Sequence, residues 1–299
     1  MRPASGRLPM RRWLQAGALL CLFACSVAQA IGGDALAARD IALIDARVAA
    51  MPRAEGEMPA LYVVGVAGDA SEDVFRNEVR FLVDAAAPRL GAGARALALV
   101  NHADSLEGDG TPLATSDNLR HTLAAIGAHM DRERDLLLLY LTMHGAEDHQ
   151  LGLVLPDGRE AALTPAELRD ALDAAGIVHR VVVISACFSG GFTPALETPD
   201  TLVLTAARAD RPSFGCGSES TITFFGHAWL LDGLNADRNF AGAFRLATRA
   251  IKQRERMLGY ERSGPRIAEG ARIGDTLARW QATLPADPPP AVYPYPIAP

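Results

Sequence analysis

Two segments of the sequence each end at a side chain that can take part in nucleophilic chemistry. Residues 135–143 form an almost continuous apolar run that stops at His144-Gly145. Residues 180–186 form a second such run that stops at Cys187. A cysteine thiol needs a base, and the imidazole of histidine titrates near neutral pH. The two segments therefore predict a cysteine nucleophile with a histidine partner.

Both runs have the composition of parallel strands that are covered on both faces. Between them a helix is predicted from Thr164, which supplies a hydroxyl cap, followed by proline at the first helical position and glutamate three residues on. A strand–helix–strand unit can bring the carboxyl ends of its strands together, where open α/β sheets place their ligands. We expect His144 and Cys187 to share a cleft there. The backbone N–H groups of Gly145 and Cys187 would then suit a developing oxyanion.

Strands and helices alternate along the rest of the chain. Further extended segments are predicted over 61–68, 96–101, 151–155 and 202–207. Helices are predicted over 34–51, 72–88, 115–130, 223–234 and 239–258, and the last two are expected to end the core. This order predicts an α/β fold in which a mostly parallel sheet lies between layers of helices.

The first 30 residues predict a secretory signal. Four arginines precede an apolar stretch that closes on Ala28-Gln29-Ala30, a small-x-small cleavage pattern. The stretch is shorter than the roughly 18 residues that indicate a spanning helix. A second interpretation is lipidation at Cys25, because residues 22–25 loosely resemble a lipoprotein processing site. Cleavage after Ala30 is favoured, and under both interpretations the protein is exported, to the periplasm or beyond.

The exported chain is acidic and poor in cysteine. Removing residues 1–30 takes away four arginines and no acids, so the formal charge moves from −6 to −10. This balance argues against nucleic acid or an anionic membrane as a partner. Only Cys187 and Cys216 remain, too few for a disulfide scaffold. A Cys187–Cys216 bridge is the alternative to a free nucleophile.

The chain divides into four parts by composition. After the signal comes a helical segment over 31–59, then a single α/β domain over 60–283. Residues 284–299 are crowded with prolines and predict an extended tail.

The two strand ends closely resemble the legumain family, which contains asparaginyl endopeptidases and the catalytic subunit of GPI transamidase, in the caspase-like clan. The clan signature is an apolar run ending in His-Gly and a second one ending in Ala-Cys, present here at 136–145 and 181–187. Further landmarks follow in the family's order, at Gly152–Pro156, Ser189-Gly190, Thr205–Ala207, Ser213–Cys216 and Phe225-Gly226. The resemblance covers roughly residues 60–235.

The resemblance implies a caspase-like three-layer α/β/α sandwich with a mostly parallel central sheet. It also implies that His144 is the general base and Cys187 the nucleophile, which would hydrolyse peptide bonds through an acyl-enzyme. A peptide or protein is the implied substrate, and no metal or organic cofactor is implied. Cys216 is expected to be a structural thiol of the loop at 212–220.

The substrate pocket departs from the family pattern. Legumains hold asparagine at P1 with one arginine and two acids. Arg76 matches the arginine, but Ser185 and His227 stand where the acids would be, and Ser213 belongs to the same implied set. A pocket that keeps a donor and loses its acceptors should favour a carboxylate. The expected P1 preference therefore tilts from asparagine toward aspartate, more so if His227 is protonated.

Other functions fit these residues less well. A transpeptidase or transamidase would use the same acyl-enzyme, and the sequence does not separate it from a hydrolase. An inactive caspase-like, peptide-binding protein is disfavoured because His144, Gly145 and Cys187 are all present. Ser189 lacks the glycine two residues earlier that a serine-hydrolase elbow requires. Finally, the spacing of His144 with residues 148–149 matches no known metal-binding pattern.

Overall fold

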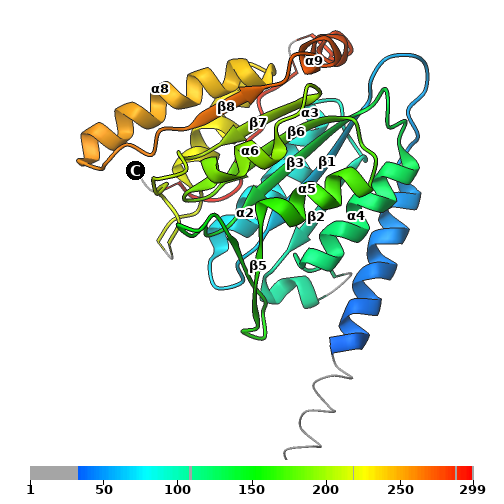
Figure 1. Cartoon of the computed structure of the whole chain (residues 1–299), viewed down its shortest axis with the longest axis horizontal. Coiled ribbons are helices and arrows are strands. Elements are labelled where there is room, and N and C mark those ends of the chain that lie inside the picture. The colour runs from blue at the N-terminus through cyan, green and yellow to red at the C-terminus, as the bar shows by residue number, and fades with distance from the viewer. Residues whose placement is uncertain (1–32, 108–109, 218, 287, 298–299) are drawn as a thin grey trace, which may run out of the picture.

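The computed structural model describes residues 33–107, 110–217, 219–286 and 288–297. The predicted signal segment, with Cys25, lies outside these residues. Within them the chain forms one six-stranded sheet in the order β2-β1-β3-β6-β7-β8, with helices on both sides (Figure 1). The predicted α/β/α sandwich with a mostly parallel sheet is confirmed.

The strands are β1 (Leu61–Ala67), β2 (Ala96–Val100), β3 (Leu136–Thr142), β6 (His179–Ser185), β7 (Thr201–Thr205) and β8 (Arg266–Glu269). Neighbouring strands are parallel except for β7 and β8, which are antiparallel. A separate antiparallel hairpin joins β4 (Leu151–Val154) and β5 (Glu160–Leu163). The predicted strands are confirmed, with ends that shift by at most two residues.

The longer helices are a first helix over 33–50, α2 (Asp73–Phe81), α4 (Ser116–His129), α5 (Pro165–Ala174), α8 (Phe240–Leu258) and α9 (Ile273–Gln281). Shorter turns are α3 (Ala87–Arg89), η2 (Ala103–Leu106), η3 (Ser189–Phe192), α6 (Thr193–Leu196) and α7 (Leu234–Ala236). Two segments have π-helical winding, η1 (Leu82–Ala86) between α2 and α3, and η4 (Gly226–Gly233) before α7. The helix predicted over 223–234 is therefore largely a π-helix.

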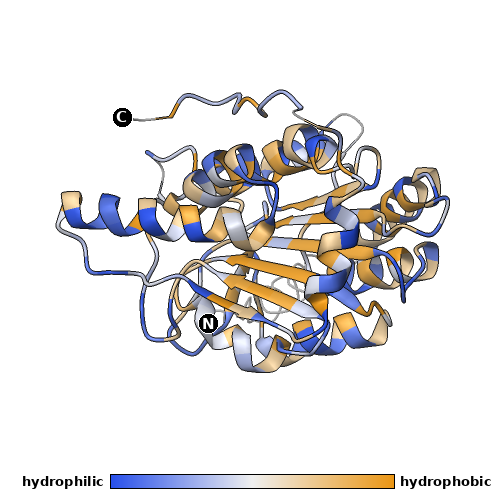
Figure 2. Ribbon diagram, turned by 90° about the horizontal axis from the view of Figure 1, so that it is seen from above, coloured by the Kyte–Doolittle hydropathy of each residue, from blue (hydrophilic) through white to orange (hydrophobic). Residues whose placement is uncertain are grey.

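Alternate residues of each strand pack against different helical layers. From β1, Leu61 and Val63 pack in the hydrophobic cluster that includes α2, η4, α8 and α9. Tyr62 and Val64 pack in the cluster on the other face, with α4, α5 and the first helix. Because both faces are covered, the central strands β1, β3, β6 and β7 are largely apolar, as Figure 2 shows between helices with hydrophilic outer surfaces.

The helix after β5 begins as the sequence predicts. The Thr164 hydroxyl accepts the N–H of Glu167, and the Glu167 carboxylate accepts the N–H of Thr164, which completes a capping box. Satisfying these otherwise unpaired N–H groups fixes where α5 starts. The helix then leads into β6, which ends just before Cys187.

The expectation that the core ends with the helix over 239–258 is wrong. The chain adds β8 at the sheet edge and α9 against the sheet, where Ile273 and Trp280 are buried. No pattern in the sequence indicates β8, because the strand is only four residues long and largely exposed.

The two ends of the described chain pack on opposite layers. In the first helix, Ile44 and Val48 are buried against the α4–α5 layer. The proline-rich tail instead crosses the α2 layer, where the Tyr293 ring contacts Phe81 and its hydroxyl donates to the Thr221 carbonyl at 2.5 Å. Among the described residues, no helix combines the length and apolar character needed to span a bilayer.

Candidate active site

His144 and Cys187 lie in adjacent turns at the carboxyl end of the sheet. β3 and β6 are parallel neighbours in which Thr142 pairs with Ser185. His144 and Cys187 each lie two residues beyond this pair. Gly145 packs directly on the Cys187 backbone, because a Cβ at this glycine would overlap the Cys187 carbonyl oxygen. The absence of a side chain at Gly145 thus lets the two turns meet.

The His144 ring is half exposed, with 44% of its side chain accessible to solvent. The ring of Phe75, from α2, meets it edge to face with centroids 5.2 Å apart. Glu72, the residue before α2, places Oε2 3.6 Å from His144 Nε2. That oxygen is buried and has no hydrogen-bond donor within the described residues. A carboxylate so placed can orient an imidazole and stabilise its protonated form.

The Cys187 sulfur is held by the loop at 213–217. Ser213 donates its backbone N–H to Sγ at 3.2 Å, and its carbonyl and hydroxyl oxygens lie 3.5 and 3.6 Å from the sulfur. The Cys216 thiol belongs to the same loop and neighbours this sulfur, and both cysteines are free. The next residue, Phe188, has a left-handed backbone (φ 54°), which turns the chain sharply after the nucleophile.

These contacts favour the thiolate. Hydrogen bonding from the Cys216 thiol lowers the pKa of the Cys187 thiol from 9.0 to about 6. Burial opposes this shift, whereas the Ser213 N–H and hydroxyl and the charge of His144 add to it. The same hydrogen bond and burial raise the pKa of the Cys216 thiol. Cys187 can therefore be ionised at neutral pH while Cys216 stays protonated as its donor.

Two backbone donors in the turns that carry His144 and Cys187 are unused. Within the described residues, the N–H groups of Gly145 and Cys187 donate to no acceptor. An oxygen that becomes negatively charged during attack by the sulfur could be stabilised by such donors.

The structure gives the four predicted substrate-binding residues different surroundings. Ser213 contacts the Cys187 sulfur, whereas Ser185 is buried with its hydroxyl 3.1 Å from that of Thr223. The Arg76 guanidinium pairs with Asp73 at 3.0 Å and with Asp104 at 3.2 Å. A direct contact between Arg76 and His227 is not found in the described part of the chain.

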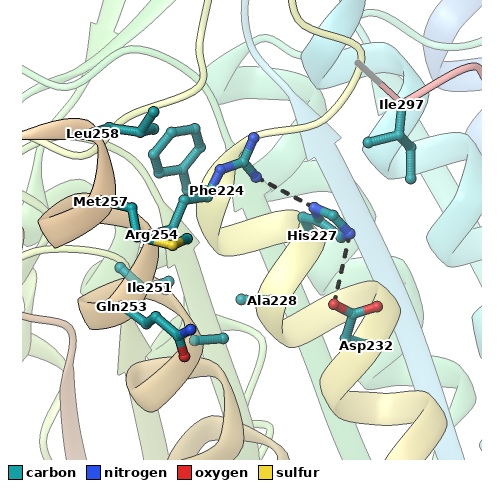
Figure 3. A pocket seen from close by; sticks show the side chains of 11 residues that line it. Phe224, His227, Ala228, Asp232, Ile251, Gln253, Arg254, Met257, Leu258 and Ile297 are labelled. Carbon is teal, nitrogen blue, oxygen red and sulfur yellow. Dashed lines mark hydrogen bonds and ion pairs between the residues drawn. The ribbon is translucent and has the colours of Figure 1, made fainter. Parts of the chain in front are cut away.

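His227 lines a groove of about 590 Å³ between η4 and α8 (Figure 3). Its ring lies between Arg254, 3.3 Å from Nδ1, and Asp232, 3.6 Å from Nε2. Phe224 lines the same groove and receives the Arg254 guanidinium over its ring at 3.9 Å. Neither His144 nor Cys187 is among the described residues that line it.

The alternative sites have other roles in this structure. Ser189 is fully buried and its hydroxyl accepts the Ala207 N–H at 3.1 Å, so it is not placed as an exposed nucleophile. The His149 ring packs over Gly191, away from any cluster of ligands. No group of three or more His, Cys, Asp or Glu side chains suited to a metal ion occurs in the described part of the chain.

Two of these contacts were not anticipated from the sequence. Glu72 lies 72 positions before its histidine neighbour, and no pattern joins the two residues. Cys216 is expected to be a structural thiol of its loop, and the structure adds an effect of this thiol on Cys187, whose pKa it lowers. Its position in a glycine-flanked loop, Gly215-Cys216-Gly217, was the available signal that the loop approaches another backbone closely.

The model of the "Peptidase C13 family" matches residues 116–268, from α4 to β8, and this range includes His144, Cys187 and Ser213. The crystal structure of caspase-1 from Spodoptera frugiperda is similar over 73% of this chain and 88% of that chain, with a TM-score of 0.46 and 12% identity. The comparison with curated proteins found no match.

Proposed function

Because the chain belongs to the peptidase C13 family, the legumain family of cysteine peptidases, we propose that it is an endopeptidase with Cys187 as nucleophile and His144 as base. The observation that carries this proposal is the Cys187 sulfur itself, which accepts the Ser213 N–H at 3.2 Å beside His144. A bound, ionised sulfur at the end of a parallel strand is the group that acyl transfer requires.

The reaction begins with attack of the Cys187 thiolate on the carbonyl carbon of the scissile peptide. The negative charge that forms on the carbonyl oxygen is stabilised by the N–H groups of Gly145 and Cys187. The C–N bond then breaks, and protonated His144 gives its proton to the leaving amine. Water, deprotonated by His144, then cleaves the resulting thioester, which releases a carboxylic acid and restores the Cys187 thiolate beside protonated His144.

Glu72 serves as the orienting group for His144 in this proposal. Its buried oxygen, 3.6 Å from Nε2, carries negative charge close to the ring that must accept a proton. The Phe75 ring packs against the imidazole and limits its rotation. His144 can then present its other nitrogen toward the cleft.

The decisive experiment is cleavage of a peptide library by wild-type protein beside Cys187→Ala. The proposal predicts defined cleavage sites with wild type and none with the variant. Products identified by mass spectrometry with and without added amine nucleophiles also separate hydrolysis from transpeptidation. Cleavage that survives in Cys187→Ala would contradict the assigned nucleophile.

Export is proposed on the sequence of residues 1–30. Mass spectrometry of the protein from fractionated cells tests it, because cleavage after Ala30 and lipidation of Cys25 give different amino termini and masses. A protein that retains Met1 in the cytoplasm would contradict both routes.

A further inference from the structure

Glu78 is a fully buried acid next to the candidate active site that the proposed reaction does not use. Its Oε2 accepts the hydroxyls of Tyr140 and Thr142, each at 2.7 Å, and its Oε1 accepts the Thr223 N–H at 2.7 Å. Within the described residues no cation pairs with it. A buried carboxyl group is costly unless such bonds satisfy it, so this arrangement indicates a specific role.

The carboxyl group joins three segments that meet near the carboxyl end of the sheet. Glu78 belongs to α2, Tyr140 and Thr142 to β3, and Thr223 to the segment before η4. The Thr223 hydroxyl in turn lies 3.1 Å from that of Ser185 in β6 and accepts the Gly226 N–H at 2.8 Å. Gly226 packs on Glu78 so closely that a Cβ would overlap the carboxylate.

From Thr223 the contacts continue to the nucleophile. Phe224 donates its N–H to the Phe214 carbonyl at 3.0 Å. Gly215 has a left-handed backbone (φ 86°), and a Cβ there would overlap Phe224. Ser213, adjacent to Phe214, donates the N–H that binds Cys187 Sγ. The position of this donor thus depends on where residues 223–224 are held.

We propose that Glu78 is a positioning residue for the nucleophile: its carboxyl group fixes Thr223, and through Phe224 and Phe214 it fixes the Ser213 N–H on the Cys187 sulfur. The inference rests on the proposed function, in which that sulfur is the attacking group. It assigns Glu78 no contact with substrate or with the reacting atoms.

A carboxyl group suits this position better than an amide. Three donors converge on its two oxygens, and the donor from Thr223 is a backbone N–H that can only donate. In Glu78→Gln the amide NH₂ must face either this N–H or the two hydroxyls, which would have to reorient. We expect the 223–226 segment to shift and the Ser213 N–H to bind the sulfur less well.

The test follows the alkylation rate of Cys187 by iodoacetamide against pH, with the Cys187 peptide quantified by mass spectrometry. In Glu78→Gln the midpoint should rise by about one pH unit, the size expected when one hydrogen bond to a thiolate is weakened. The matched control is Asp135→Asn. Asp135 is also fully buried and accepts the N–H groups of Ala60 and Asp131, but at the opposite end of β3. In Asp135→Asn the midpoint of the Cys187 alkylation profile should equal that of wild type, although both variants lose stability.

A second variant, Thr223→Val, tests the same proposal if Glu78→Gln does not fold. Thr223→Val keeps the side-chain shape and the N–H to Glu78 but removes the hydroxyl that binds Ser185 and Gly226. It should raise the midpoint by a smaller amount in the same direction. Wild-type midpoints in every folded variant, or an equal rise in Asp135→Asn, would overturn the proposal.

The measurement also separates this proposal from the proposed function. Alkylation needs no peptide turnover, so a protein that cleaves no peptide would refute the peptidase activity and still report the midpoint shift. Conversely, an active peptidase whose midpoint is unchanged by Glu78→Gln would refute the positioning role alone.

Discussion

The two ends of the central sheet bind their buried acids in different ways. At the amino end, Asp135 pairs with Arg134 at 2.9 Å, and Asp200 is paired with Arg272, whose Nε lies 2.9 Å away. At the carboxyl end, Glu78 is bound by two hydroxyls and one N–H, and the described residues supply no cation.

This difference indicates what each end does. Ion pairs at the amino end neutralise acids that hold strand starts in place, so their contribution is to stability. At the carboxyl end neutral donors hold the acid and the sulfur, and the charge of His144 is available to the thiol. Substitutions at the two ends should therefore separate loss of stability from loss of reactivity.

The largest expected effect is that of Cys187→Ala. Removing the nucleophile should lower kcat/KM for the best library peptide by a factor on the order of 10⁴ or more. The melting temperature should stay close to that of wild type, because a small side chain at a strand end leaves little cavity. Peptide assays and thermal unfolding by circular dichroism check both expectations. Retained activity would show that another residue is the nucleophile.

His144→Ala should have the next largest effect. Loss of a general base lowers rates by roughly 10²–10⁴-fold. The matched control is His121→Ala, because His121 also binds a carboxylate, Asp45 at 2.7 Å, but its ion pair joins α4 to the first helix and not to the turn of Cys187. Equal kcat/KM values for the two variants would show that His144 is not the base of the reaction.

At the amino end, Asp200→Asn should change stability and leave activity intact. The hydrogen bond and charge of Arg272 lower the pKa of the Asp200 carboxyl. Its contribution is therefore present above the unfolded pKa of about 3.9 and is lost as pH falls through the lower folded value. Because Arg272 is largely exposed, we expect a loss of about 1 kcal/mol at pH 7 that shrinks toward pH 2. Urea unfolding at several pH values measures this loss of stability. A loss of kcat instead would contradict the assignment of the amino end of the sheet to stability.

The smallest expected effect concerns P1 specificity. If Arg76 reads P1, Arg76→Ala should change the ratio of kcat/KM for matched Asp and Asn substrates by a few fold toward Asn. Its pairing with Asp73 and Asp104 already satisfies part of its charge, which is why the expected change is small. A clear Asn preference that is unaltered in Arg76→Ala would refute the pocket model and leave the roles of His144 and Cys187 standing.

The sequence predicted features that local patterns encode. Apolar runs located β3 and β6, and the cap residues located the start of α5. Features that depend on distant partners were not predictable in this way. Glu78 binds Thr223 across 145 positions, and nothing near Glu78 distinguishes it from a surface acid on an amphipathic helix. The exposed strand β8 was missed because pairing at an edge needs no apolar pattern.

The alkylation rate of Cys187 against pH shows whether this residue is an activated thiolate beside His144. The midpoint of the rate profile should lie near pH 6 in wild-type protein, in line with the lowered pKa of this thiol, and should be higher in His144→Ala. A midpoint near the ordinary thiol value of about 8.5 in both proteins would contradict this activation.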